Sequence, residues 1–196
     1  LMTADSGGLT YLDHALNATL MMSHVAARSG DHVGLLAFDK DVRAYLPPSS
    51  GARATQKIVV TAYDVHPSLV ETDYAVAFDL LARRLPKRAL VVLFTQVVDD
   101  VAARALARQL RALPRRHLPL CVLFRDEAIE GLLDPSFDDG DRSLYLKGAA
   151  AELVLWRERL EHELKAGGAH VLAPAPHELT PMLVNRYLEI KAKQLL

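Results

Sequence analysis

The stretch GDHVGLLAFDKDVRAYLPP, residues 30–48, decides the fold class of this chain. Its residues 32–38 form a short continuous apolar run, which is typical of a strand buried on both faces of a sheet. A polar turn follows at residues 39–41, and residues 42–46 then form a second predicted strand that is stopped by Pro47 and Pro48. Because so short a link cannot carry a crossover, we expect the two strands to pair antiparallel.

Outside this stretch, helical periodicity alternates with further short apolar runs. A helix is predicted over residues 10–29, where Thr10 and Asp13 resemble a capping box and Gly30 supplies a stop. The other predicted strands are residues 89–95, 118–124 and 170–175, and the other predicted helices are residues 52–63, 73–85, 99–113, 146–166 and 178–194.

This alternation predicts one α/β domain over residues 1–196. We expect a mostly parallel sheet with one antiparallel edge strand and helices on both faces. Most such sheets open with a strand, whereas this chain opens with a helix. We therefore expect a first central strand to be missing or to lie upstream of residue 1.

The composition is that of a globular protein, with 51% hydrophobic and 24% charged residues. A formal net charge of −1 gives no electrostatic support for a nucleic-acid partner. The single cysteine, Cys121, excludes an internal disulfide and a zinc site built from cysteines, and its apolar neighbours predict a buried, inert thiol. No apolar stretch is long enough for a membrane span, so this domain is not expected to cross a membrane.

Several blocks of the sequence resemble a von Willebrand factor A domain, and more narrowly the bacterial family known as domain of unknown function 58. They occur in order over about the first 135 residues: LDHALNATLMMSHVA (12–26), GDHVGLLAFDKDVRAYLPP (30–48), LVETDYAVAF (69–78) and RRHLPLCVLFRD (115–126). The resemblance implies the von Willebrand factor A fold, a Rossmann-like sheet, and a metal-ion-dependent adhesion site at its edge.

In that family a loop after the first strand, a threonine from a second loop and an aspartate from a third hold one divalent cation. Thr72 matches the threonine, but Gln96 stands where the aspartate belongs and Leu1 where the first loop has a serine. Asp99, or its neighbour Asp100, could substitute. A neutral amide is a poor ligand for a hard cation, so the implied site is degenerate and holds no metal, or Mg²⁺ or Mn²⁺ only weakly. The alternative roles are a helix N-cap for Thr72 and compensation of the helix dipole for Asp99.

The resemblance also implies a non-enzymatic module that binds a protein partner. The implied partner is a MoxR-type AAA ATPase, and the implied role is the assembly or maturation of protein complexes. The implied location is the cytoplasm, including the cytoplasmic face of the inner membrane as part of a longer, membrane-anchored protein. Ligands of α/β sheets bind at the carboxyl ends of the strands, so the binding surface is expected at residues 2–8, 71–74 and 95–100. The partner-binding candidates are Met2, Glu71, Asp73 and Tyr74.

An enzymatic alternative is a Mg²⁺-dependent phosphatase of the haloacid-dehalogenase type. Asp39 would be the nucleophile and Asp41 the second acid, with Thr95 after a later strand and residues 138–139 as downstream acids. An Asp-x-Asp sequence is also typical of a tight turn between two strands. A strand follows Asp41 at once, where the phosphatase would place a flap and a helix.

Overall fold

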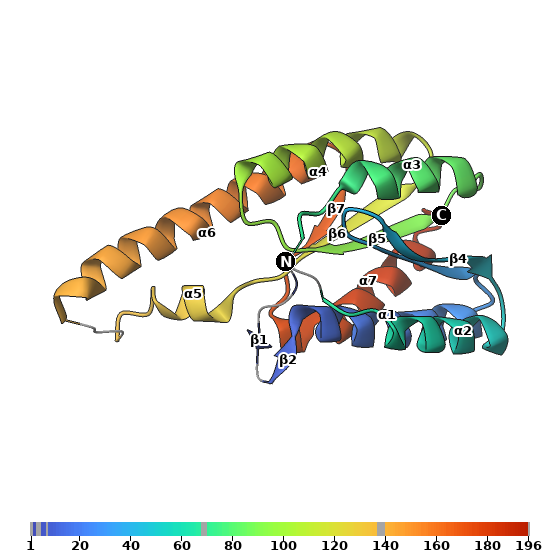
Figure 1. Cartoon of the computed structure of the whole chain (residues 1–196), viewed down its shortest axis with the longest axis horizontal. Helices are drawn as coiled ribbons and strands as arrows, with labels where there is room; N and C mark the ends of the chain where they lie inside the picture. Colours follow the sequence, from blue (N-terminus) through green and yellow to red (C-terminus); the bar gives the residue numbers. More distant parts are fainter. Residues whose placement is uncertain (1, 3–4, 7, 68–69, 137–139, 196) are drawn as a thin grey trace.

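The computed structural model describes residues 2, 5–6, 8–67, 70–136 and 140–195 (Figure 1). Strands lie between two groups of helices, so the fold is α/β, as expected. The strands are β1 (Asp5–Ser6), β2 (Leu9–Thr10), β3 (Val33–Phe38), β4 (Val42–Ser49), β5 (Leu90–Thr95), β6 (Leu118–Leu123) and β7 (His170–Leu172). The α-helices are α1 (Tyr11–Arg28), α2 (Ala52–Tyr63), α3 (Tyr74–Arg84), α4 (Asp100–Ala112), α5 (Glu127–Gly131), α6 (Ser143–Ala166) and α7 (Leu179–Ala192).

The strands of the described residues form three separate sheets. β5, β6 and β7 make a parallel sheet, β3 and β4 an antiparallel pair, and β1 and β2 a two-residue hairpin. The parallel sheet and the antiparallel pair are confirmed. The expectation of one continuous sheet is wrong, because β3 and β5 share no hydrogen bonds.

Two hydrophobic clusters cover the two faces of the parallel sheet. One contains side chains of α3, α4 and α6, and the other contains side chains of α1 and α7. Strand β5 contributes to both, since Val91 and Leu93 pack in the first cluster and Leu90, Val92 and Phe94 in the second. This alternation is the two-residue period of a strand that is covered on both faces. The expected helices on both faces are therefore confirmed (Figure 1).

Local signals located the first helix correctly. The backbone N–H of Asp13 donates to Thr10 Oγ1 at 3.1 Å, and the backbone N–H of Thr10 donates to Asp13 Oδ2 at 2.8 Å. These two bonds are the predicted capping box, and they satisfy backbone donors that the start of a helix leaves unpaired.

Strand β4 differs from the prediction, because it continues through Pro47 and Pro48 as far as Ser49. Both prolines are exposed, and among the described strands β4 pairs only with β3. Neither proline is a paired residue, because both lie at the register shift between the Leu35–Leu46 and Val33–Ser49 pairs, and such an irregularity in an edge strand tolerates proline. Strand β3 is half-buried and not buried on both faces as predicted, with Gly34 exposed.

The long helix α6 extends from the body as an arm, with the short, unanticipated helix α5 beside it (Figure 1). Arg157 of α6 pairs with Glu130 of α5 at 3.0 Å. Near the start of α6, Leu144 and Tyr145 are 83% and 80% exposed. In the described part of the chain, no helix has both the length and the apolar character needed to cross a membrane.

Candidate functional site

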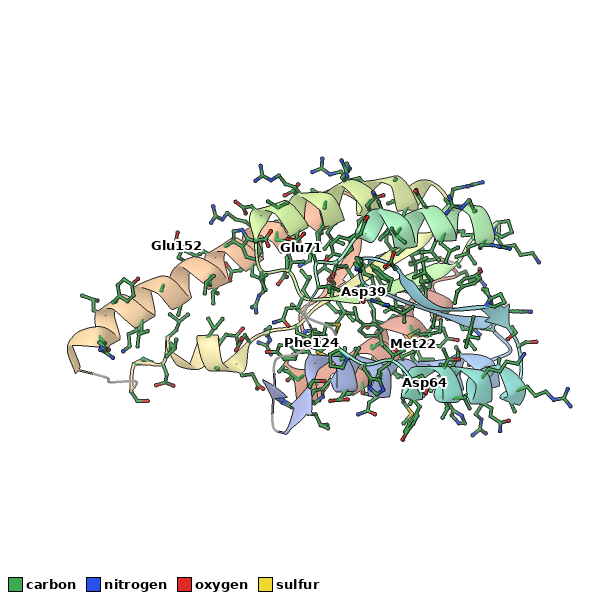
Figure 2. The ribbon with its side chains drawn as sticks, viewed as in Figure 1. Met22, Asp39, Asp64, Glu71, Phe124 and Glu152 are labelled. Carbon is green, nitrogen blue, oxygen red and sulfur yellow. The ribbon has the colours of Figure 1, made fainter. Side chains whose placement is uncertain are left out.

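The carboxyl ends of β3 and β5 meet at Tyr74, the first residue of α3. The Phe38 and Tyr74 ring centroids lie 6.2 Å apart in an edge-on arrangement, and the Tyr74 hydroxyl bonds to Thr95 Oγ1 at 2.7 Å. The backbone N–H of Asp73 donates to the carbonyl oxygen of Asp39 at 3.0 Å. Phe38 ends β3 and Thr95 ends β5, so both strands run in the same direction and finish at one edge, where Figure 2 labels Asp39 and Glu71.

Tyr74 supports this edge from inside the protein. Only 3% of its surface is exposed, and burial raises the pKa of its phenol to about 12, so it stays protonated at neutral pH. The prediction that Tyr74 contacts a partner conflicts with this position, because its side chain is in the core. Met2 is also packed inward: its backbone oxygen accepts from Leu12 N–H at 3.1 Å, and its side chain packs on the cluster beneath α1 and α7.

The acids at this edge cap helices. Asp73 Oδ1 accepts the backbone N–H of Ala75 at 2.8 Å and so caps α3. Asp99 Oδ1 accepts the backbone N–H groups of Val101 and Ala102, both at 2.8 Å, and so caps α4. The N-cap role suggested for Thr72 is therefore wrong, because its neighbour Asp73 fills it. For Asp99 the suggested alternative was compensation of the helix dipole, and the structure shows it as the N-cap of α4.

The predicted metal ligands do not fit a divalent cation as they are arranged. Thr72 and Gln96 both line a cavity between β3 and β5. Asp99 does not line this cavity, and its carboxylate is bonded to the backbone at the start of α4. The buried Oε1 of Gln96 has no hydrogen-bond partner among the described residues. An amide and a hydroxyl bring no negative charge to balance a hard cation. Within the described ranges, no three His, Cys, Asp or Glu side chains are grouped as a metal site would require.

The Asp39 carboxylate is held within the turn between β3 and β4. Its Oδ1 accepts the backbone N–H of Asp41 at 3.0 Å, and its Oδ2 accepts Nε–H of Arg43 at 2.7 Å. Strand β4 begins at Val42, directly after this turn. The predicted downstream acids, residues 138–139, lie outside the described residues. This geometry favours the turn interpretation of the Asp-x-Asp sequence over the phosphatase interpretation.

Two exposed valines lie among the acids of this edge. Val98 is 54% exposed and Val101 is 75% exposed, which leaves two large apolar side chains in water. The edge surface, as we name it, consists of Glu71, Asp73, Val98, Asp99, Asp100 and Val101, all of them exposed. The sequence prediction included the acids of this surface and covered Val98 within residues 95–100 without singling it out, but it missed Val101. The available signal was VVDDV at residues 97–101, where apolar residues surround a helix cap.

A search among curated proteins found no match for this chain. A family model described as "Protein of unknown function DUF58" matches residues 4–137, which is more than half of the chain. The matched range contains α1, the β3–β4 pair, β5 and β6, and with them every residue of the edge surface. The chain therefore belongs to the DUF58 family of proteins of unknown function.

Proposed function

We propose that this chain is a von Willebrand factor A-type domain that binds a protein partner through the edge surface and catalyses no reaction. The partner we propose is a MoxR-type AAA ATPase, in a process of complex assembly or maturation. The place of action is the cytoplasm, including the cytoplasmic face of the inner membrane where the domain belongs to a longer anchored protein. The observation that carries the proposal is the pair of exposed valines surrounded by carboxylates at the carboxyl edge.

The composition of the edge surface supports binding to another protein. Specific interfaces have an apolar centre that excludes water and a polar rim that remains hydrated. Val98 and Val101 supply the apolar centre, and Glu71, Asp73 and Asp100 supply the rim. The excess of negative charge favours a partner with basic groups around an apolar contact.

The polar groups at the edge support a structural role over catalysis. Asp39 is bonded to Arg43, Asp73 and Asp99 cap helices, and the Thr95 hydroxyl is bonded to Tyr74. A catalytic acid, base or nucleophile must be able to reach a substrate proton or electrophile. These groups are instead committed to holding the edge in one shape. Binding through such a rigid surface needs no cation, so we expect EDTA to leave the affinity unchanged.

The test is isothermal titration of the purified chain with a purified MoxR-type AAA ATPase. We expect Val98→Arg and Val101→Arg each to weaken binding by at least about tenfold, which corresponds to ~1.4 kcal/mol. The matched control is Val60→Arg, because Val60 is 62% exposed but lies on α2, away from the edge. Equal affinities for all three variants, or no binding by the unaltered chain, would contradict the proposal.

A second assay addresses the absence of catalysis. We expect no Mg²⁺-dependent hydrolysis of p-nitrophenyl phosphate by the purified chain. Hydrolysis that disappears in Asp39→Asn would instead establish the phosphatase alternative, with Asp39 as nucleophile.

A further inference from the structure

Helices α4 and α6 lie side by side on one face of the parallel sheet and run in the same direction (Figure 1). Trp156 Nε1–H donates to Asp100 Oδ1 at 2.6 Å near the start of α4, and Arg111 Nη2–H donates to Glu163 Oε1 at 2.8 Å near its end. The two helices line an open groove of about 640 Å³. We call it the arginine groove, and its lining consists of Arg104, Ala107, Arg108, Arg111, Ala112 and Glu163.

The arginines of this groove share one face of α4. Arg104, Arg108 and Arg111 are spaced four and then three residues apart, so they project from the same side of the helix within about 10 Å along its axis. Among the described residues that line the groove, Glu163 is the single acid, and it is bonded to Arg111. With three arginines against one glutamate, the lining has an excess of two positive charges.

This arrangement leaves positive charges without compensation. Like charges one turn apart on a helix repel each other. Within the part of the chain that the structure describes, no carboxylate pairs with Arg104 or Arg108, and Arg104 donates its Nε–H to the backbone oxygen of Asp100 at 3.1 Å. An anion in the groove would remove the repulsion and accept charge-assisted hydrogen bonds from the guanidinium groups. The groove therefore favours a negatively charged ligand.

The rest of the lining selects the kind of anion. Ala107 and Ala112 are the only apolar residues among the described residues of the lining. They provide no aromatic ring on which a nucleic-acid base could stack, and no large apolar side chain of the kind that anchors a protein partner. Binding must then come from charge and hydrogen bonds. A terminal phosphate group carries a charge of about −1.5 to −2 at pH 7, and its oxygens match the planar fork of a guanidinium.

We propose that the arginine groove binds a ligand with two or three linked phosphate groups, held by Arg104, Arg108 and Arg111. Two sources share this chemistry, a free polyphosphate and the headgroup of a lipid with two phosphates such as cardiolipin. Glu163 competes with the ligand for the Arg111 guanidinium. The inference does not depend on the proposed function, because the arginine groove shares no residue with the edge surface and its test contains no protein partner.

The first test is isothermal titration of the chain with inorganic tripolyphosphate, in EDTA so that no metal ion bridges the two. We expect saturable binding with a Kd below about 1 mM that weakens as salt is added. Arg108→Gln should weaken binding by at least about tenfold, because it removes charge-assisted hydrogen bonds to phosphate. The matched control is Arg53→Gln, since Arg53 is also an exposed arginine but lies on α2. It should leave the Kd unchanged.

A second variant is expected to improve binding. Glu163→Gln removes the negative charge from the arginine groove and releases Arg111, so it should tighten tripolyphosphate binding by about threefold. Glu158→Gln is the control, because Glu158 is an exposed glutamate of α6 outside the groove lining. Equal effects of the two substitutions, or no gain from Glu163→Gln, would overturn the assignment to this groove.

Vesicle sedimentation distinguishes the two sources of phosphate. Sedimentation with cardiolipin vesicles but not with phosphatidylcholine vesicles, lost in Arg108→Gln, would identify the lipid headgroup. Tripolyphosphate binding without sedimentation would identify a free polyphosphate. Neither binding nor sedimentation would overturn the proposal. A tetraglutamate peptide that binds as tightly as tripolyphosphate would overturn the choice of phosphate and indicate an acidic peptide.

Discussion

The hydrogen bond between Tyr74 and Thr95 allows a quantitative test of how the carboxyl edge is held together. Both residues are buried, with 3% and 6% of their surfaces exposed, and their oxygens lie 2.7 Å apart. Tyr74→Phe leaves the Thr95 hydroxyl buried without this partner, which should lower the free energy of unfolding by about 1–3 kcal/mol. Thr95→Val should cost a similar amount, because it leaves the Tyr74 phenol unsatisfied.

The double variant separates the bond from the general effect of substitution. When both hydroxyl groups are removed, no buried polar group of this pair remains unsatisfied. We therefore expect the double variant to lose less stability than the sum of the two single variants, with a coupling of about 1 kcal/mol or more.

Urea unfolding followed by circular dichroism measures these differences. The urea concentration at the midpoint of unfolding should fall. The slope of the free energy of unfolding against urea concentration should stay constant, because the surface exposed on unfolding is unchanged. In a domain of this size 1 kcal/mol corresponds to a shift of about 2–4 °C in Tm. Tyr63→Phe is the matched control, because Tyr63 is 84% exposed and should change nothing measurable. Single effects that add to within about 0.5 kcal/mol would refute the coupling.

Three further predictions concern other parts of the fold. A Cβ at Gly34 would lie 2.7 Å from the backbone oxygen of Leu46 in β4, so Gly34→Ala should lower the free energy of unfolding, measured by urea unfolding, by about 1–3 kcal/mol. The control Gly148→Ala, in open space on α6, should raise the free energy of unfolding. Burial lowers the pKa of His117, so its imidazole binds a proton more readily in the unfolded state than in the folded state. The contribution of His117 to the free energy of unfolding should be fully present above pH ~6.5 and be lost as the pH falls toward the lowered pKa of the folded state. In urea unfolding at a series of pH values, His117→Gln should reduce this loss. Burial raises the pKa of Cys121 to about 12, so Ellman's reagent should react with the thiol only after unfolding, and rapid reaction of the native chain would contradict its burial.

Some residues of the carboxyl edge could be assigned a role from the sequence alone, and others could not. The sequence left Asp99 open to two interpretations, as a metal ligand or as compensation of the helix dipole, and its N-cap role became visible only through its bonds to two backbone N–H groups. The capping role that was assigned to Thr72 belongs to Asp73. An error of one residue is usual where several residues that can cap a helix are adjacent, because each can accept the same backbone donors.

The sequence by itself determined the elements whose signals are local. The capping box at Thr10 and Asp13, the apolar run of β5 and the turn at Asp39 each depend on residues within a few positions of one another, so periodicity and capping chemistry were sufficient. The burial of Cys121 followed in the same way from its apolar neighbours.

Only the tertiary structure decided how these elements face one another. The bond between Tyr74 and Thr95, the exposure of Val98 and Val101, and the cavity between β3 and β5 depend on segments that are distant in the chain. An apolar run shows that a strand will be buried, but it does not show which strand pairs with each of its edges. The backbone hydrogen bonds that settle this are the same for every residue type, so side chains alone do not encode which edges remain open.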